Sequence, residues 1–196
     1  DKNINIICEK PLLTNLKKTK SILKKIREKK LFIFETFSYI FSKSFIKLKN
    51  LIKRKQIKYI HSSFQFPFLN NNNFRYKLKE GGFFLDSAVY PISLETFLLG
   101  NESKNIKNLK TTSNFKKKKP INGKIKYSIF NQKRVFTWGT GLIYKNFVKI
   151  KLKDSIIFYK KIFTKIKDEN VKLIIQKNKK REEINFKYHD QFEIMF

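Results

Sequence analysis

The sequence predicts an α+β fold in which helices cover one face of an open, mostly antiparallel β-sheet. Its first half alternates strand-like and helix-like segments, whereas the part after Gly100 consists of short β-rich runs separated by turn residues. Helices followed by a run of strands are typical of this class, because an apolar sheet face must be covered by another layer. With 41% hydrophobic residues and 21 Phe among 196 residues, the chain can also bury a core, which excludes a disordered protein.

The chain opens with a strand–helix–strand unit. Residues 5–8 form a short apolar run typical of a buried parallel strand, and Glu9-Lys10-Pro11 ends it, since proline cannot donate into a ladder. Thr14 is a good N-cap for a helix over residues 15–30, and residues 31–37 are β-rich again. This order predicts a right-handed βαβ crossover.

Two more helices are predicted in the first half. The first covers residues 44–55, with Phe45, Ile46, Leu48, Leu51 and Ile52 on its buried side, and a strand over residues 57–66 follows. Gly81-Gly82 precedes the second, over residues 85–99, which Gly100 closes.

The half after Gly100 supplies most of the predicted sheet. Turn signals such as Asn122-Gly123 and Asp168-Glu169-Asn170 separate its β-rich runs. These runs cover residues 107–115, 124–130, 134–142, 147–152, 155–163, 171–176 and 183–188.

The charge is large but is carried almost entirely by lysine. There are 45 Lys and Arg against 15 Asp and Glu, a formal net charge of +30. Nucleic-acid surfaces usually use arginine as well, for its bidentate fork. The lysines occur together with many Asn, Ile and Phe residues, a combination that A+T-rich codons encode. The linear sequence also does not gather the lysines on one face. We therefore expect solvated lysines and no nucleic-acid partner.

Several other classes of protein are excluded or disfavoured. No run approaches the ~20 apolar residues of a membrane span, and no signal peptide is visible, so we expect a cytoplasmic protein without a membrane partner. A lone cysteine, Cys8, excludes a disulfide scaffold, and with His61 and His189 it matches no zinc spacing, so no metal is expected. Ser87 has no nearby histidine base, and Trp138 is expected in the core.

Two short motifs carry chemistry. Lys10 stands at the C-terminal end of the opening strand, the edge at which open α/β sheets bind ligands. In the second motif, Gly81-Gly82 is followed by Asp86 and Tyr90, which a helix would place on one face, one turn apart. Taken alone, each motif also fits a purely structural role. Lys10 could be an ordinary strand-end lysine in a lysine-rich chain, and Asp86 could cap a helix in which Tyr90 is a packed side chain.

Together and in this order, the motifs resemble one family, the glucose–fructose oxidoreductase, inositol dehydrogenase and MocA-like NAD(P)-dependent dehydrogenases. Glu9-Lys10-Pro11 matches the strand that ends the family's Rossmann domain, and Gly81-Gly82-x-x-x-Asp86-x-x-x-Tyr90 matches the first long helix of its sheet domain. The resemblance implies that residues 1–30 are the last strand and helix of a truncated Rossmann domain. Residues 31–196 would be the C-terminal α/β substrate-binding and oligomerisation domain.

The resemblance also implies a mechanism and a cofactor, NAD or NADP. Hydride would pass between the nicotinamide and a carbon of a sugar-type substrate, with Lys10, Asp86 and Tyr90 as catalytic residues. Tyr90 would transfer the proton, and Lys10 would hold the same oxygen and lower the phenol's pKa. Asp86 would orient Lys10 or bind a neighbouring hydroxyl group. Glu9, Lys10 and Pro11 would lie on the cofactor side, and Arg75 would bind substrate together with Asp86 and Tyr90.

One departure from the family bears on the cofactor. No Gly-x-Gly-x-x-Gly loop is present, and the chain has only 6 Gly, so it contains no pyrophosphate site. The leading hypothesis is the C-terminal part of an oxidoreductase that forms homo-oligomers through the sheet face. The alternatives are a non-catalytic remnant or assembly module of the family, and a basic nucleic-acid-binding protein.

Overall fold

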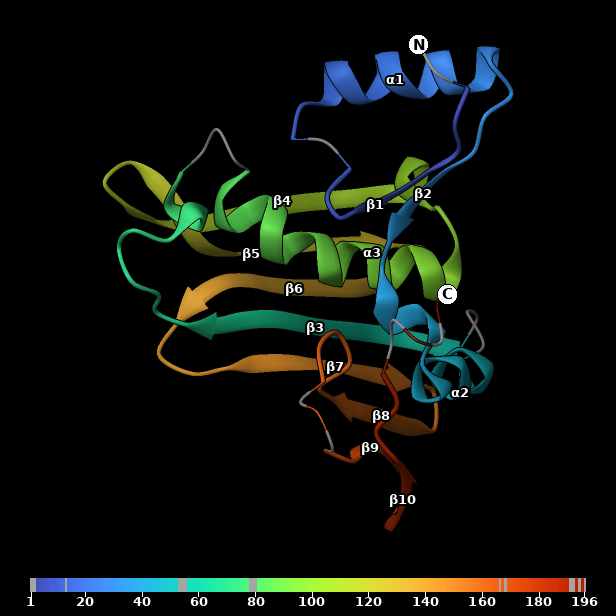
Figure 1. Ribbon diagram of the computed structural model, residues 1–196. Coiled ribbons are helices and arrows are strands. Elements are labelled where there is room, and N and C mark those ends of the chain that lie inside the picture. Colours follow the sequence, from blue (N-terminus) through green and yellow to red (C-terminus); the bar gives the residue numbers. More distant parts are fainter. Residues whose placement is uncertain are drawn as a thin grey trace.

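The computed structural model describes residues 3–12, 14–52, 56–77, 81–165, 167, 169–190, 193 and 195. Its α+β architecture is the one predicted: a short parallel strand pair with a helix, then an eight-stranded open sheet with further helices (Figure 1). The division into residues 1–30 and 31–196 stays a prediction.

The opening unit consists of β1 (Ile6–Glu9), α1 (Leu16–Glu28) and β2 (Ile33–Thr36), and the two strands pair in parallel. The predicted N-cap, Thr14, is wrong by one residue. Asn15 has an extended backbone, and its side chain accepts a hydrogen bond from the amide of Lys18. Asn15 therefore provides a hydrogen-bond acceptor for a backbone amide in the first turn of α1 that has no partner within the helix. Thr14 does not serve as the cap, so its side chain is available for another contact.

The second helix, α2 (Lys43–Leu51), begins after Ser42, whose side chain accepts a hydrogen bond from the amide of Phe45. Residues 53–55 of the predicted helix lie outside the described residues. Phe45 and Leu48 are buried as predicted, but Ile46 is 49% exposed, because it lies on the solvent side of α2.

The third helical segment starts earlier than predicted. Residues 82 and 83 are already helical, a π-helical turn covers Phe84–Ala88, and α3 (Val89–Leu99) follows and ends at Gly100. Glu95 of α3 ties the helix to the sheet. It accepts a hydrogen bond from Arg134 Nε at 2.5 Å, in a nearly fully buried ion pair, and another from the hydroxyl of Tyr127.

The large sheet has the strand order β10-β9-β8-β7-β3-β6-β5-β4, and only its β3–β6 pair is parallel. All of the predicted β-rich runs after Gly100 form strands. β8 ends before residue 163, because Lys161 turns the chain with a φ of 57°. The strands are β3 (Ile57–Pro67), β4 (Ile106–Lys116), β5 (Lys119–Ile129), β6 (Gln132–Gly141), β7 (Lys145–Leu152), β8 (Ser155–Lys160), β9 (Val171–Lys177) and β10 (Lys180–Phe186).

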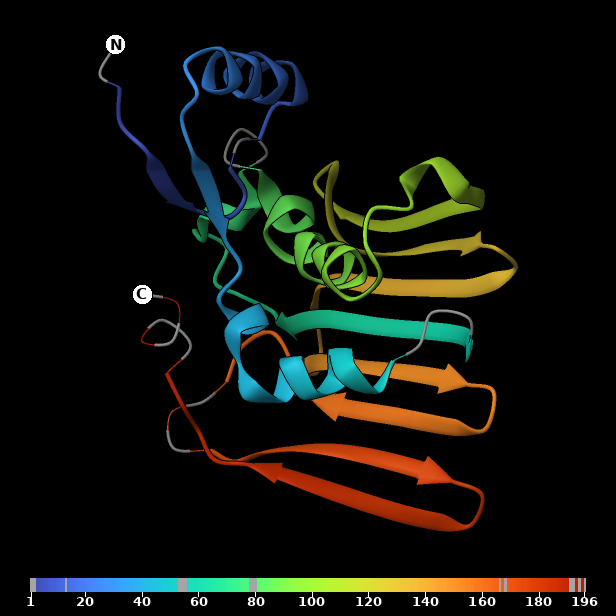
Figure 2. The same ribbon diagram turned by 90° about the vertical axis from the view of Figure 1, so that its right-hand side faces the viewer.

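The core lies between the sheet and the helices on one of its faces. α2 and α3 pack against that face, and the views show no helix over the opposite face within the described residues (Figures 1 and 2). Trp138 is in the core, as predicted, at 2% exposure. We call the opposite face the open face. No helix among the described residues is long and apolar enough to cross a membrane.

Candidate active site

Lys10 lies in the loop that follows β1, and two hydrogen bonds fix this loop to β2. Thr36 Oγ1 donates to Glu9 Oε1 at 3.0 Å, and the amide of Leu12 donates to Glu35 Oε1 at 2.8 Å. One of these hydrogen bonds precedes Lys10 in the chain and the other follows it. Together they fix the backbone from which the Lys10 side chain extends.

Asp86 holds the end of the Lys10 side chain. Lys10 Nζ donates to Asp86 Oδ1 at 3.0 Å and to its main-chain oxygen at 2.9 Å, while Arg75 Nε donates to Asp86 Oδ2 at 2.5 Å. The Lys10 and Asp86 side chains are only 11% and 16% exposed. The structure thus brings together the strand-end lysine, the helix aspartate and Arg75 in a cluster with one carboxylate and two cations.

The start of the helical segment explains how Asp86 reaches Lys10. Gly81 has a φ of 94°, and a Cβ added there would lie 3.2 Å from both Thr14 Cγ2 and Leu85 Cβ. The positive φ of Gly81 favours glycine over any other residue. The close approach of Thr14, in the segment that follows Lys10, also favours glycine there. Asp86 lies in the π-helical turn Phe84–Ala88, a feature found frequently at functional sites.

Tyr90 lies at the start of α3, with Lys10 Nζ 4.5 Å from its ring centroid. The ring packs edge-on against Phe64, with centroids 4.6 Å apart. Burial raises the pKa of the Tyr90 hydroxyl far above its ordinary value, and the charges of Asp86 and Glu9 raise this pKa further. This direction is opposite to the lowered pKa that the family resemblance implies, because burial of the phenol outweighs the positive charge nearby. Tyr90 is therefore a neutral phenol at pH 7.

Tyr90 also lines a cavity of about 300 Å³, which Ser38, Phe163, Thr164, Lys165, Tyr188 and Asp190 complete. The cavity offers a cation, hydroxyl groups, a carboxylate and aromatic rings, the types of group that bind a polyhydroxylated ligand. A ligand seated there would touch the phenol directly.

Pro11 does not join this cluster. It follows Lys10 through a cis peptide bond and lines a separate hollow of about 320 Å³ with Leu12, Thr19 and Ile33, between the strand pair and α1. Among the predicted cofactor-side residues, Glu9 and Lys10 lie near Tyr90, whereas Pro11 faces the first helix.

Lys165 is the cavity residue that the sequence analysis missed. Burial lowers the pKa of its ammonium to about 8, and its Nζ donates a hydrogen bond to Ser44 Oγ at 3.4 Å. Nothing distinguishes this lysine among 45 basic residues in the linear sequence. Only the fold shows that it shares a cavity with Tyr90.

Comparison with known proteins relates the fold of this chain to that of sugar oxidoreductases. No protein-family model matches the chain. A stretch of 102 residues is 28% identical to dTDP-3,4-didehydro-2,6-dideoxy-alpha-D-glucose 3-reductase of Streptomyces violaceoruber, covering 50% of this chain and 30% of that protein.

Solved structures match over nearly the whole chain. KijD10, a 3-ketoreductase from Actinomadura kijaniata solved with NADP and TDP-benzene, matches with a TM-score of 0.86 and 20% identity, over 97% of this chain and 60% of its own. An aldose-aldose oxidoreductase from Caulobacter crescentus matches with a TM-score of 0.80 and 9% identity, over 92% and 55%. UDP-N-acetylglucosamine 3-dehydrogenase from Acidithiobacillus ferrooxidans matches with a TM-score of 0.75 and 11% identity, over 96% and 57%.

These matches confirm the predicted resemblance at the level of the fold. The chain has the fold of the C-terminal part of KijD10 and of oxidoreductases of the glucose–fructose oxidoreductase, inositol dehydrogenase and MocA type. It spans about three fifths of the length of the solved relatives, and its match to the curated reductase covers 30% of that protein.

Proposed function

We propose that this chain is the substrate-binding part of a cytoplasmic, NAD(P)-dependent oxidoreductase that reduces a ketone on a sugar or nucleotide-linked sugar. The observation that carries the proposal is the position of Lys10. It joins Asp86 to the ring of Tyr90, and Tyr90 in turn lines a cavity whose groups suit a sugar.

The protonation state of Tyr90 favours reduction. A neutral phenol can donate its proton to a carbonyl oxygen as that oxygen gains negative charge, and the raised pKa of Tyr90 keeps the proton available at pH 7. The nicotinamide cofactor supplies the hydride when it is bound. Two relatives are named as reductases acting at position 3 of their substrates, which agrees with this direction.

Lys10 and Asp86 have supporting roles in this mechanism. The Lys10 ammonium stabilises negative charge that develops on the substrate oxygen, and Asp86 keeps the ammonium in place. Arg75 holds the second oxygen of Asp86, so the carboxylate cannot rotate away from Lys10. In the cavity, Lys165 offers a positive charge to an anionic part of the substrate, such as the diphosphate of a nucleotide sugar.

The cofactor needs residues that this chain lacks. The Glu9–Lys10 loop suits the nicotinamide side, but no glycine-rich loop for the pyrophosphate is present in the sequence. We assign that loop to a domain outside this chain. The same domain would also determine whether NAD or NADP is bound.

The proposal is tested with a polypeptide that joins these residues to their upstream domain. Oxidation of NADPH and NADH is followed with nucleotide-linked keto-sugars, free ketoses and, as a control, the corresponding sugar alcohols. We expect cofactor oxidation with a keto-sugar and none with the alcohols. A polypeptide that binds NADPH stoichiometrically but turns over with none of the ketones would contradict the proposal, in favour of a non-catalytic assembly module.

A further inference from the structure

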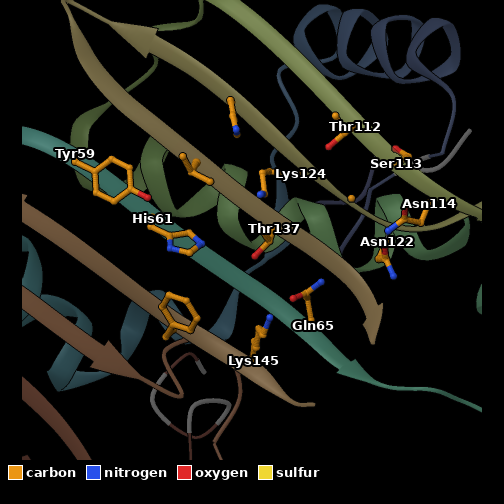
Figure 3. A pocket seen from close by; sticks show the side chains of 14 residues that line it. Tyr59, His61, Gln65, Thr112, Ser113, Asn114, Asn122, Lys124, Thr137 and Lys145 are labelled. Atoms are coloured by element: carbon orange, nitrogen blue, oxygen red, sulfur yellow. Dashed lines mark hydrogen bonds between the residues drawn. The ribbon is translucent and has the colours of Figure 1, made fainter. Parts of the chain in front are cut away.

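Asn146 on β7 is a buried polar residue to which the mechanism above gives no role. Its neighbours in the strand, Lys145 and Phe147, line a hollow of about 680 Å³ on the open face, and Figure 3 shows Lys145 directed into it. Because side chains alternate along a strand, Asn146 points to the face that the helices cover, and it is only 5% exposed. A polar side chain buried in this way is normally satisfied by hydrogen bonds, so its partners indicate what it holds in place.

Asn146 holds the segment that follows β8. The amide of Phe163 donates to Asn146 Oδ1 at 3.0 Å, and Asn146 Nδ2 donates to the main-chain oxygen of Thr164 at 2.9 Å. The amide of Lys161 donates to the main-chain oxygen of Asn146 at 2.6 Å. These bonds fix the backbone of a segment that supplies Phe163, Thr164 and Lys165 to the cavity of about 300 Å³ in the candidate active site.

The same side chain restricts what two hydroxyl groups can donate. A main-chain amide only donates and a main-chain carbonyl only accepts, so the contacts with Phe163 and Thr164 distinguish the oxygen of the Asn146 side chain from its nitrogen. Nδ2 also donates to the hydroxyls of Tyr144, at 2.9 Å, and of Thr164, at 3.0 Å. A side-chain amide nitrogen is only a donor, so neither hydroxyl can donate to it in return.

One hydroxyl proton of this pair is therefore left over. The hydroxyl oxygens of Tyr144 and Thr164 are 2.6 Å apart, so one hydroxyl donates to the other. Among the described residues no further acceptor takes up the second proton. When Tyr144 is the donor, the free proton belongs to Thr164, in the cavity wall, and Lys165 adds an ammonium group at the next position in the chain.

We propose that Asn146 is a positioning residue for an anion subsite formed by Thr164 and Lys165, and that this subsite binds a phosphoryl group of the substrate. The inference rests on the proposed function and deepens it, because it names a phosphorylated keto-sugar as the substrate class. An ionised phosphoryl oxygen only accepts hydrogen bonds, so it matches a hydroxyl proton beside an ammonium group. Asp190, the carboxylate in the same cavity wall, suits sugar hydroxyls, which can donate to it.

Phe163 relates this subsite to the proposed proton donor. Its ring packs against Tyr90, with centroids 5.4 Å apart, and its amide is one of the groups that Asn146 holds. The segment that carries the anion subsite is therefore also in contact with Tyr90. A substrate bound by its phosphoryl group at Thr164 and Lys165 would have its sugar directed along the cavity toward the phenol.

The subsite is tested by binding, separately from turnover. Isothermal titration calorimetry measures the affinity of thymidine diphosphate and of inorganic pyrophosphate for the polypeptide that includes the upstream domain, saturated with NADP so that the probes do not occupy the cofactor site. Asn146→Asp keeps an oxygen for the Phe163 amide but replaces the NH₂ group with an acceptor, which takes up the free hydroxyl proton. We expect both probes to bind about tenfold more weakly, since a hydrogen bond to a charged group is lost.

Two further variants make this test specific. Thr164→Val removes the hydroxyl in the cavity wall but leaves the main-chain partners of Asn146 in place, and it should weaken both probes to a similar extent. Asn178→Asp introduces the same change of charge at an exposed position in the turn between β9 and β10, and it should bind like wild type. Equal weakening in Asn146→Asp and Asn178→Asp would overturn the inference, because net charge alone would then set the affinity. Wild-type affinity in Thr164→Val would overturn it as well.

Steady-state kinetics separate positioning from a general structural role. In Asn146→Asp, the KM for a nucleoside-diphosphate-linked keto-sugar should rise about tenfold while kcat stays near the wild-type value, because Tyr90 itself is unchanged. A fall in kcat with an unchanged KM would contradict the anion subsite. A wild-type polypeptide that binds thymidine diphosphate but reduces no keto-sugar would contradict the proposed function alone, whereas one that reduces keto-sugars and binds neither probe would contradict the anion subsite alone.

Discussion

Asp86 is the residue on which the candidate site depends, because it joins two motifs that lie far apart in the sequence. Its two carboxylate oxygens take separate partners, Lys10 and Arg75. Lys10, Arg75 and Asp86 together carry one net positive charge, and Glu9 adds a negative charge near Tyr90. In the proposed reaction, Tyr90 would donate a proton to the substrate oxygen while Lys10 stabilises its negative charge.

We expect Lys165 to give the proposed reaction a pH dependence. Its pKa of about 8 means that it is mostly charged at pH 7 and neutral well above pH 8. For a nucleotide-linked keto-sugar, kcat/KM should therefore fall roughly tenfold as pH rises through this pKa, since a hydrogen bond from a charged group is lost. In Lys165→Met, kcat/KM should be low and should not respond to pH in this range.

Initial rates at low substrate concentration measure this dependence. The exposed lysine variant Lys153→Met serves as the control and should keep the wild-type profile. A wild-type profile that is flat between pH 7 and pH 9, about one unit either side of that pKa, would exclude Lys165 as the group that binds the anion.

At the scale of single residues, Lys10, Asp86 and Tyr90 were proposed because their motifs resemble those of one family, and Arg75 because that resemblance implies a substrate-binding role for it. The sequence did not predict the raised pKa of Tyr90, since the burial that causes it depends on packing. Nor did it predict Lys165, which reaches the cavity from a loop after β8.

At the scale of elements, the start of the third helical segment positions the site. Gly81 allows the chain after Lys10 to pack against this segment, and the π-helical turn carries Asp86. Sequence patterns predicted this helix from the glycines that precede and end it, but they did not predict the π-helical turn. The strands were predicted more fully, because alternating side chains and turn residues are local signals, whereas a widened helical turn is stabilised by tertiary contacts.

Gly81→Ala tests the role of this turn. A Cβ at Gly81 would meet Thr14 and Leu85, and a φ of 94° disfavours any L-residue, so we expect a loss of about 1–3 kcal/mol in the free energy of unfolding. Gly141→Ala is a matched control, since a Cβ there meets nothing within 4 Å. Urea denaturation of both variants measures the difference, and equal stabilities would show that the turn does not constrain Gly81.

At the scale of the whole molecule, the proposed function implies that the chain supplies one side of a two-part site. Because it contains no glycine-rich phosphate loop, we expect no saturable binding of NADP(H) to the 196-residue chain by isothermal titration calorimetry. The polypeptide that includes the upstream domain should bind the cofactor. Saturable binding to the chain alone would mean that other residues provide the pyrophosphate site.

The gathering of lysines on one face of the sheet was not predicted from the sequence, which led us to expect dispersed lysines. Lys124 and Lys126 on β5, and Lys149 and Lys151 on β7, alternate with buried residues, so the members of each pair lie on the same face. What the sequence alone could not supply is the order of the strands, which brings these lysines together from β5 and β7.

The most direct test of the proposed reaction compares Tyr90→Phe with Tyr39→Phe in the polypeptide that includes the upstream domain. Both substitutions remove one hydroxyl from adjacent rings whose centroids are 6.2 Å apart; Tyr39 is buried and Tyr90 half-buried, and only Tyr90 lines the cavity. Under single-turnover conditions, Tyr90→Phe should lower the rate of keto-sugar reduction by about 100-fold or more, and Tyr39→Phe should leave it near the wild-type rate. An unchanged rate in Tyr90→Phe would contradict the assignment of Tyr90 as the proton donor.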